Sequence, residues 1–146
     1  MRNENVIQSL NNLLADASVL YQKLRAMHWL VTGREFFVLH ARFEGLYNAW
    51  AEHVDDIAER VLTIGGKPLA TLAEILEHAR IKEFAGTATP KDMVKTLVGD
   101  LEHILAGATE TIAAAERVGD RGTANLLDGI RDEQEKTLWM LNAWLA

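Results

Sequence analysis

The sequence contains no cysteine among its 146 residues. Without thiols, the chain can form neither a disulfide framework nor a thiolate metal site. Any bound metal would therefore be held by histidine, aspartate or glutamate side chains, a set of ligands that favours iron, manganese or zinc.

Long apolar runs are also missing. No stretch reaches the roughly 18 consecutive apolar residues that a membrane-spanning helix needs, and the opening MRNENVIQSL lacks the charged, apolar and small-residue order of a secretory signal. These absences predict a soluble, cytoplasmic protein with no membrane segment. Because 49% of the residues are hydrophobic, we expect one domain with its own core over residues 1–146.

Basic residues are fewer than acidic ones. The chain carries 15 Lys and Arg residues against 21 Asp and Glu residues, for a formal net charge of -6, and Arg2 is the only basic residue before Lys23. A negative chain without a basic N-terminal arm repels a phosphate backbone. Direct DNA binding is therefore not expected.

What the sequence does contain is a helical period along nearly its whole length. Apolar residues recur every three or four positions, as on one face of an amphipathic helix. Thr89 can cap a helix start, and Pro90 fits the first helical turn. The pattern predicts four long helices, over residues 4–30, 36–64, 90–118 and after the segment GDRGT at 119–123.

The connection between the second and third predicted helices is long. It runs from Gly65 to Ala88 and contains a short helical pattern, TLAEILEHA. One long crossover in a four-helix bundle is typical of the ferritin-like arrangement. The sequence thus predicts an all-α, ferritin-like four-helix bundle with a short helix in the crossover between the second and third helices.

The segment HVDDIAER, residues 53–60, is unusually rich in charge for an amphipathic helix. Asp56 and Arg60 stand four residues apart with the acid first, which favours an ordinary ion pair on a solvated helix face. Asp55 and Glu59 have no base between them, so their carboxylates repel unless a cation lies nearby.

Four residues of ligand type share one narrow face of the second predicted helix. With about 100° per residue and His40 at zero, Glu44 falls near 40°, Asp55 near 60° and Glu59 near 100°. The large apolar side chains of this helix lie on an adjoining sector, which we expect to face the core. His53 falls near 220° and lies outside this set.

The spacing of these residues limits what one chain can do. His40 and Asp55 are 15 residues apart, so they are separated by roughly 22 Å along the helix axis. Two copies of the helix packed antiparallel about a two-fold axis would set His40 opposite Glu59, and Glu44 opposite Asp55, of the second copy. We therefore expect a site shared between chains.

Each candidate also has a plainer interpretation. A single histidine such as His28 or His40 is more often a packed or surface side chain than a ligand, and single helix carboxylates are usually solvated. Shared placement on one face favours ligation. Trp29, which follows His28, could pack or could donate an electron to an oxidised metal centre, and His78 and His103 have no recognisable partners.

These residues together resemble the signature of the Dps family of miniferritins, over almost the whole chain. The resemblance is carried by His28-Trp29, Gly33, Phe36 or Phe37, Leu39-His40, Phe43-Glu44, Asp55 and Ala58-Glu59-Arg60, with GDRGTANLL and LWML further along. It implies a ferritin-like subunit that assembles into a hollow dodecamer with an iron-oxidising centre at each two-fold interface. His28 and His40 would come from one subunit and Asp55 and Glu59 from its neighbour, with Glu44 as a further ligand and two irons per site.

The resemblance also implies an activity. Hydrogen peroxide or, less readily, dioxygen would oxidise Fe(II), and the ferric mineral would be stored in the cavity as protection against oxidative stress. Iron would pass through acidic pores at three-fold axes, where Asn125 replaces the acid of many family members and Glu116, Asp120 and Asp128 are the candidates.

Two alternatives remain open. The chain could be a nucleoid-associated, DNA-protecting structural protein of the same fold, with binding that weakens steeply as salt rises. It could also be a cage without chemistry that acts as an interaction protein. The lysine-rich tail of DNA-condensing family members is absent.

Overall fold

The protein is helical over the residues that its computed structural model describes, 3–86 and 88–146, and no strand occurs in them. Arg2 lies outside these residues. The helices are α1 (Glu4–Leu30), α2 (Phe36–Thr63), α3 (Leu72–His78), α4 (Pro90–Arg117) and α5 (Arg121–Leu145). The predicted four-helix bundle is confirmed, and so is the short helix in the crossover.

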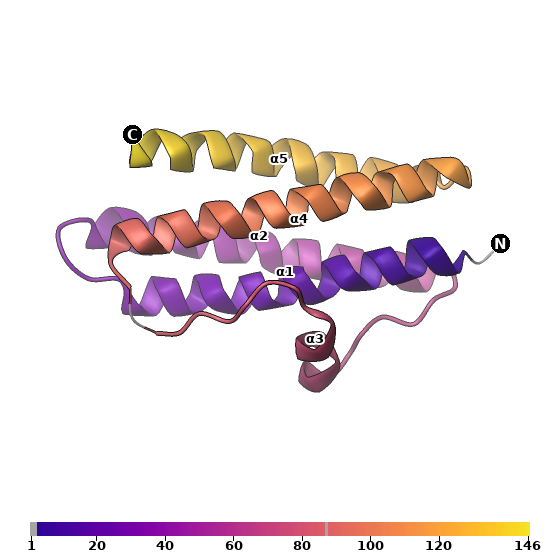
Figure 1. Ribbon diagram of the computed structural model, residues 1–146, viewed down its shortest axis with the longest axis horizontal. Helices are drawn as coiled ribbons and strands as arrows, with labels where there is room; N and C mark the ends of the chain where they lie inside the picture. Colours follow the sequence, from indigo (N-terminus) through magenta and orange to yellow (C-terminus); the bar gives the residue numbers. More distant parts are fainter. Residues whose placement is uncertain (1–2, 87) are drawn as a thin grey trace.

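The four long helices lie side by side along the long axis of the molecule (Figure 1). α1 packs against both α2 and α4, and α4 packs against α5. The crossover after α2 runs back along the whole bundle, so α2 and α4 point the same way (Figure 1). α3 sits outside the bundle against α1.

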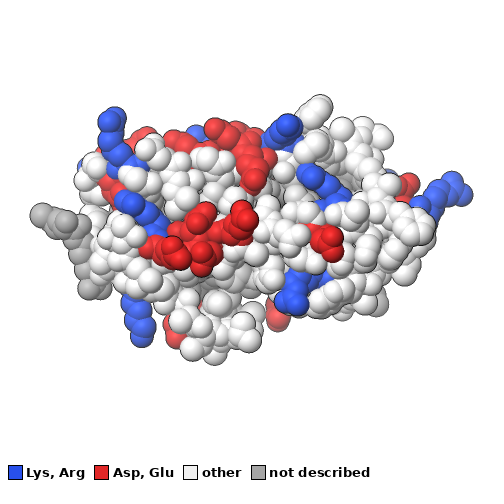
Figure 2. All heavy atoms as spheres, turned by 180° about the vertical axis from the view of Figure 1, so that it is seen from behind, with Lys and Arg blue, Asp and Glu red and all other residues white. Residues whose placement is uncertain are grey.

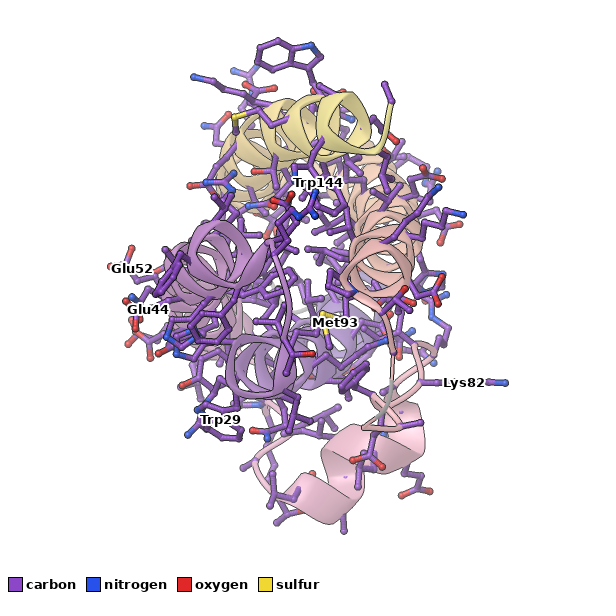
Figure 3. The ribbon with its side chains drawn as sticks, turned by 90° about the vertical axis from the view of Figure 1, so that its left-hand side faces the viewer. Trp29, Glu44, Glu52, Lys82, Met93 and Trp144 are labelled. Atoms are coloured by element: carbon purple, nitrogen blue, oxygen red, sulfur yellow. The ribbon has the colours of Figure 1, made fainter. Side chains whose placement is uncertain are left out.

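The core is built from the apolar sectors of all four long helices. Trp50 and Phe43 of α2 are the largest of the fully buried side chains, and Leu46 and Ile57 lie on the predicted sector and are buried too. Figure 3 shows Met93 pointing inward between the helices, whereas Glu44 points away from the bundle. The second helix therefore presents one face to the core and leaves the other free.

Side-chain caps fix where the helices begin. Thr89 accepts a hydrogen bond from the Asp92 amide at 3.1 Å, which confirms the predicted start of α4. The last helix begins earlier than predicted, at Arg121 inside GDRGT. The reason is Asp120, whose carboxylate accepts a hydrogen bond from the Thr123 amide at 3.1 Å and satisfies an N–H group that has no helical partner.

The predicted ion pair between Asp56 and Arg60 is wrong. The Arg60 guanidinium instead reaches from α2 to the start of α5, where Nη2 donates to Asp120 at 2.7 Å and Nε donates to Thr123 at 3.0 Å. Gly122 makes room for it, since a Cβ there would lie 2.5 Å from Arg60 Nη2. Asp120 is the better partner for Arg60 because its carboxylate is already fixed by capping α5. An ion pair with the exposed Asp56 would have to order two mobile side chains.

Candidate metal centre

His28 and His40 form an interlocked pair across the α1–α2 turn. His28 Nδ1 lies 2.7 Å from the carbonyl oxygen of His40, and His40 Nδ1 lies 2.7 Å from the carbonyl oxygen of His28. The rings stack with centroids 3.8 Å apart and planes 14° from parallel. Two residues that are 12 apart in sequence are thus held as one unit.

This pairing decides the tautomer of both rings. A carbonyl oxygen can only accept, so each Nδ1 carries the hydrogen and donates it. In the neutral rings each Nε2 then keeps a free lone pair, which is the state that binds a metal ion. Metal-ligating histidines are commonly oriented by such a bond from their other ring nitrogen to a carbonyl group.

Glu44 adds a carboxylate to the histidine pair. It lies one helical turn after His40, and its Oε1 is 3.8 Å from Nε2 of His28. Tyr47 lies beside both, and its hydroxyl donates to Glu44 Oε1 at 3.5 Å. Partial burial and the Glu44 carboxylate both raise the pKa of Tyr47, so the phenol keeps its proton near neutral pH.

Asp55 and Glu59 lie further along the same helix, and both are exposed. Figure 2 shows acidic side chains gathered on the side of the molecule where α2 lies. Within the described part of one chain, no three or more histidine, aspartate or glutamate side chains are grouped so that they could hold a metal ion. One chain therefore offers two incomplete ligand sets, one near each end of α2.

Comparison with known proteins identifies the fold family. A family model described as a ferritin-like domain matches residues 7–146. The chain is 46% identical over 143 residues to DNA protection during starvation protein 2 of Bacillus anthracis, covering 98% of each protein. A crystal structure of a Dps protein from Bacillus brevis superposes with a TM-score of 0.97 at 42% identity, covering 100% of both chains. The chain belongs to the Dps family of ferritin-like proteins.

A second Dps structure places the fold in a wider group. The Dps protein from Vibrio cholerae, described as a member of a broad superfamily of ferritin-like diiron-carboxylate proteins, superposes with a TM-score of 0.96 at 37% identity. It covers 98% of this chain and 90% of its own. The predicted family resemblance is confirmed, and membership of this superfamily supports iron binding in general.

Trp29 of this Dps chain, for which packing and electron donation were both open, lies on the surface. Its side chain is 56% exposed, and the Arg25 guanidinium lies 5.0 Å above the centre of its ring. Figure 3 shows it on the α1 side of the bundle. Its redox role stays a prediction.

The three candidate pore residues lie in different surroundings. Glu116 and Asp128 line one hollow of about 490 Å³ at the α4–α5 turn, together with Asn125. Asp120 is bound by Arg60 and Thr123. Burial raises its pKa, but the bonds from these two residues outweigh that effect, and the net pKa is lowered. Of the three candidates for a pore, Glu116 and Asp128 therefore share one hollow, whereas the Asp120 carboxylate is already bound within the subunit.

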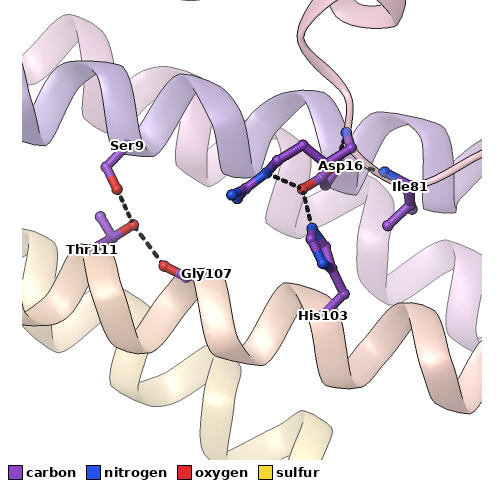
Figure 4. A network of polar contacts seen from close by, with 7 residues as sticks. Ser9, Asp16, Ile81, His103, Gly107 and Thr111 are labelled. Carbon is purple, nitrogen blue, oxygen red and sulfur yellow. Dashed lines mark hydrogen bonds and ion pairs between the residues drawn. The ribbon is translucent and has the colours of Figure 1, made fainter.

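The sequence did not reveal a buried polar network that ties the crossover to the bundle (Figure 4). Asp16 is fully buried in α1 and accepts hydrogen bonds from the amides of Arg80 at 2.6 Å and Ile81 at 3.2 Å. His103, which had no recognisable partner, lies with Nε2 3.2 Å from Asp16 Oδ2. The one available signal was an aspartate inside the apolar run LLADASV.

A buried ion pair between Lys23 and Asp100 lies beside this network. Lys23 Nζ is 2.6 Å from Asp100 Oδ2, and both side chains are largely buried. Burial raises the pKa of Asp100, although the bond from Lys23 opposes that shift. This pair joins α1 to α4 close to the crossover.

Proposed function

We propose that this Dps protein is a ferroxidase that oxidises Fe(II) with hydrogen peroxide or, less readily, dioxygen. It would store the ferric mineral inside a hollow dodecamer of single-domain subunits, residues 1–146, in the cytoplasm. The observation that carries this proposal is the locked histidine pair, in which both Nδ1 atoms are used by carbonyl groups and Nε2 of His28 lies 3.8 Å from Glu44 Oε1. Structural histidines need no such arrangement.

The proposed site is completed by a second subunit. Asp55 and Glu59 lie roughly 22 Å along α2 from the histidines, so an antiparallel α2 of the neighbour would bring its own two carboxylates to them. A two-fold contact of this kind forms the site twice. Asn48 and Ala51 lie midway on this face and are exposed in the single chain, so the face is free to receive the neighbour.

The chemistry follows from holding two irons together. Hydrogen peroxide accepts two electrons, and two adjacent Fe(II) ions supply one each, so no hydroxyl radical is released. Carboxylate and imidazole ligands suit iron, and the protein's task is to hold both ions with open positions for the oxidant. The acidic side of the molecule, and Glu116 and Asp128 at the proposed pore, would attract Fe(II).

The test is anaerobic loading with Fe(II) followed by a stoichiometric pulse of hydrogen peroxide, with ferric absorbance as the readout. We expect rapid oxidation by the wild type and loss of that rate in the Asp55→Ala, Glu59→Ala double variant. The matched control is Glu52→Ala with Asp56→Ala, which removes two other exposed acids from α2. Equal rates in both double variants, in cages of the same size, would refute the assignment.

A DNA-protecting role is the alternative, favoured by the names of the relatives. Net charge opposes it, because the chain is negative by six charges. A gel-shift titration at several salt concentrations separates the two functions, since binding to phosphates weakens steeply as salt rises. We expect no shift at physiological salt. A shift that persists in the Asp55→Ala, Glu59→Ala variant would establish DNA binding independent of the iron site.

A further inference from the structure

Phe36 extends the stacked histidine pair into a column of three rings. Its ring stacks on the His40 ring with centroids 4.7 Å apart and planes 21° from parallel. The His28 ring stacks on His40 with centroids 3.8 Å apart. Two rings this close to one imidazole, and nearly parallel to it, would overlap on a single face. The His40 ring therefore lies between Phe36 and His28.

The backbone at the start of α2 places Phe36 at the end of this column. Gly33 has a φ of 95°, in the left-handed region that favours glycine, and its carbonyl oxygen accepts a hydrogen bond from the Phe36 amide at 3.1 Å. Phe36 is the first residue of α2 and stands four positions before His40, so both side chains lie on the same side of the helix. It also packs against the core, which holds its ring in place.

The His40 ring needs a support on its outer face. Its hydrogen bond from Nδ1 to the His28 carbonyl oxygen, 2.7 Å long, fixes one ring nitrogen. A ring held by one bond can still tilt about that bond, and His28 blocks the tilt on one side only. Phe36 blocks it on the other side. Both stacking contacts together fix the direction of Nε2, the nitrogen left for a metal ion.

We infer that Phe36 is a positioning residue of the iron site, which acts by holding the His40 imidazole in the orientation that binds iron. This inference rests on the ferroxidase function proposed above. A metal ion at Nε2 draws electron density from the imidazole, and the face of a phenylalanine ring is negative, so the stack favours the metal-bound form as well. An aliphatic side chain fills the same space without such a face.

His28 does not depend on Phe36 in the same way. Its Nδ1 is held by the His40 carbonyl oxygen, and Tyr47 lies edge-on to its ring, with centroids 5.4 Å apart and planes at 79°. These contacts remain when the Phe36 ring is removed. The defect should therefore reach the site through His40, as a loss of metal affinity with the rest of the ligand set in place.

The test compares Phe36→Leu and Phe36→Met with Phe36→Tyr and Phe37→Leu. Leucine and methionine keep an apolar side chain in a helix but remove the ring, and having two such variants covers the case in which one does not assemble. Tyrosine restores the ring. Phe37→Leu is the matched control, because Phe37 is the next residue and its side chain is 84% exposed.

The probe is Co(II), which takes imidazole and carboxylate ligands as Fe(II) does and is not oxidised in the assay. Assembled protein is titrated with Co(II) and followed by calorimetry, and the heat measured with the Asp55→Ala, Glu59→Ala variant is subtracted to remove cobalt bound elsewhere on the cage. Light scattering and thermal unfolding are recorded for each preparation.

We expect the affinity for Co(II) to fall about 10-fold in Phe36→Leu and Phe36→Met, as when other groups that orient a metal ligand are removed. Phe36→Tyr and Phe37→Leu keep the affinity of the wild type. In peroxide-dependent oxidation, the two variants without the ring need a higher Fe(II) concentration for half-maximal rate but reach the same maximal rate. The reason is that excess Fe(II) traps the His40 ring in its bound orientation.

Three outcomes overturn the inference. Wild-type affinity in an assembled variant without the ring removes Phe36 from the site. An equal loss in Phe37→Leu, or a loss that tyrosine does not restore, assigns the effect to general loosening of the start of α2. If the wild type binds no more Co(II) than the Asp55→Ala, Glu59→Ala variant, the proposed shared iron site itself fails, and that comparison identifies the case.

Discussion

The two histidines show how a single side chain gains a role from its backbone surroundings. His28 lies in the last turn of α1, where carbonyl groups lack helical partners. Its carbonyl is therefore available to His40. The family resemblance assigned both histidines to one site of one subunit, but it could not show that each fixes the tautomer of the other.

We expect His28→Ala to damage both activity and stability. The variant removes a proposed ligand and also frees the His40 ring to rotate, and lost orientation of a metal ligand typically costs ~10-fold to 100-fold in metal affinity or activity. Loss of the stacked ring and its buried hydrogen bond destabilises the fold by about 1–3 kcal/mol. Peroxide-dependent oxidation and thermal unfolding measure the two effects. An unchanged oxidation rate would contradict the role of His28.

Asp120 leads to a prediction about acid stability. Its pKa is lowered in the folded protein, so its ionised form stabilises the fold above the pKa of the unfolded chain. That stabilisation is lost as the pH falls through the folded pKa. We expect thermal stability to fall with acid less steeply in Asp120→Ala than in the wild type, and the variant to be about 1–2 kcal/mol less stable at neutral pH through loss of the cap.

Asp120→Asn serves as the control for this prediction. Asparagine caps a helix about as well as aspartate, but it cannot form the ion pair with Arg60. Its acid dependence is therefore expected to match that of Asp120→Ala while its neutral stability lies closer to the wild type. A wild-type acid profile in both variants would show that other carboxylates govern the acid response.

At the scale of the helices, local signals predicted most of the structure. Apolar residues that recur every three or four positions predicted every long helix, and Thr89 with Pro90 predicted the start of α4. The start of α5 was missed because Asp120 acts together with Thr123 and the distant Arg60. The period alone could not reveal partners that are 60 residues apart.

The crossover provides a test of the buried network. Asp16→Ala would leave the amides of Arg80 and Ile81 and the His103 ring without their acceptor. Removing one partner from a buried charged network costs about 3–5 kcal/mol. We expect a matching loss of thermal stability and faster amide hydrogen exchange around Ile81. Gln8→Ala, an exposed change on the same helix, is expected to stay within about 0.5 kcal/mol of the wild type.

The outcome for Asp16→Ala also decides how the crossover is held. If exchange accelerates at Ile81 but not in α2, the network anchors the crossover locally. Equal acceleration in both would mean that Asp16 supports the whole bundle instead. Unchanged stability would show that solvent replaces the carboxylate, against the full burial of Asp16.

At the scale of the whole molecule, the proposed shared site would require α2 to serve two neighbouring sites. The helical period was enough to group the proposed ligands on one face of α2, and the fixed spacing of the motif was enough to predict the family. The structure also leaves large apolar side chains exposed in the single chain, among them Phe37, Leu72 and Trp139. Trp139 thus lies outside the subunit core. None of the helices in the described residues has the length and apolar character to cross a membrane.

Mixed cages provide the sharpest test of a shared site. His28→Ala lacks a histidine ligand but keeps both carboxylates, and the Asp55→Ala, Glu59→Ala variant has the opposite defect. When the two are unfolded and reassembled together, a pair containing one of each has one site damaged twice and one site intact. Random pairing then restores roughly one quarter of the sites, because a two-fold interface carries each site twice.

We therefore expect mixed cages to oxidise Fe(II) at roughly one quarter of the wild-type rate, while each variant reassembled alone remains inactive. Size-exclusion chromatography with light scattering confirms that all three preparations assemble equally. A site contained within one chain gives no recovery on mixing, since neither subunit then has a full set of ligands. Recovery in the mixture can arise only if the histidines of one chain and the carboxylates of another act on the same iron.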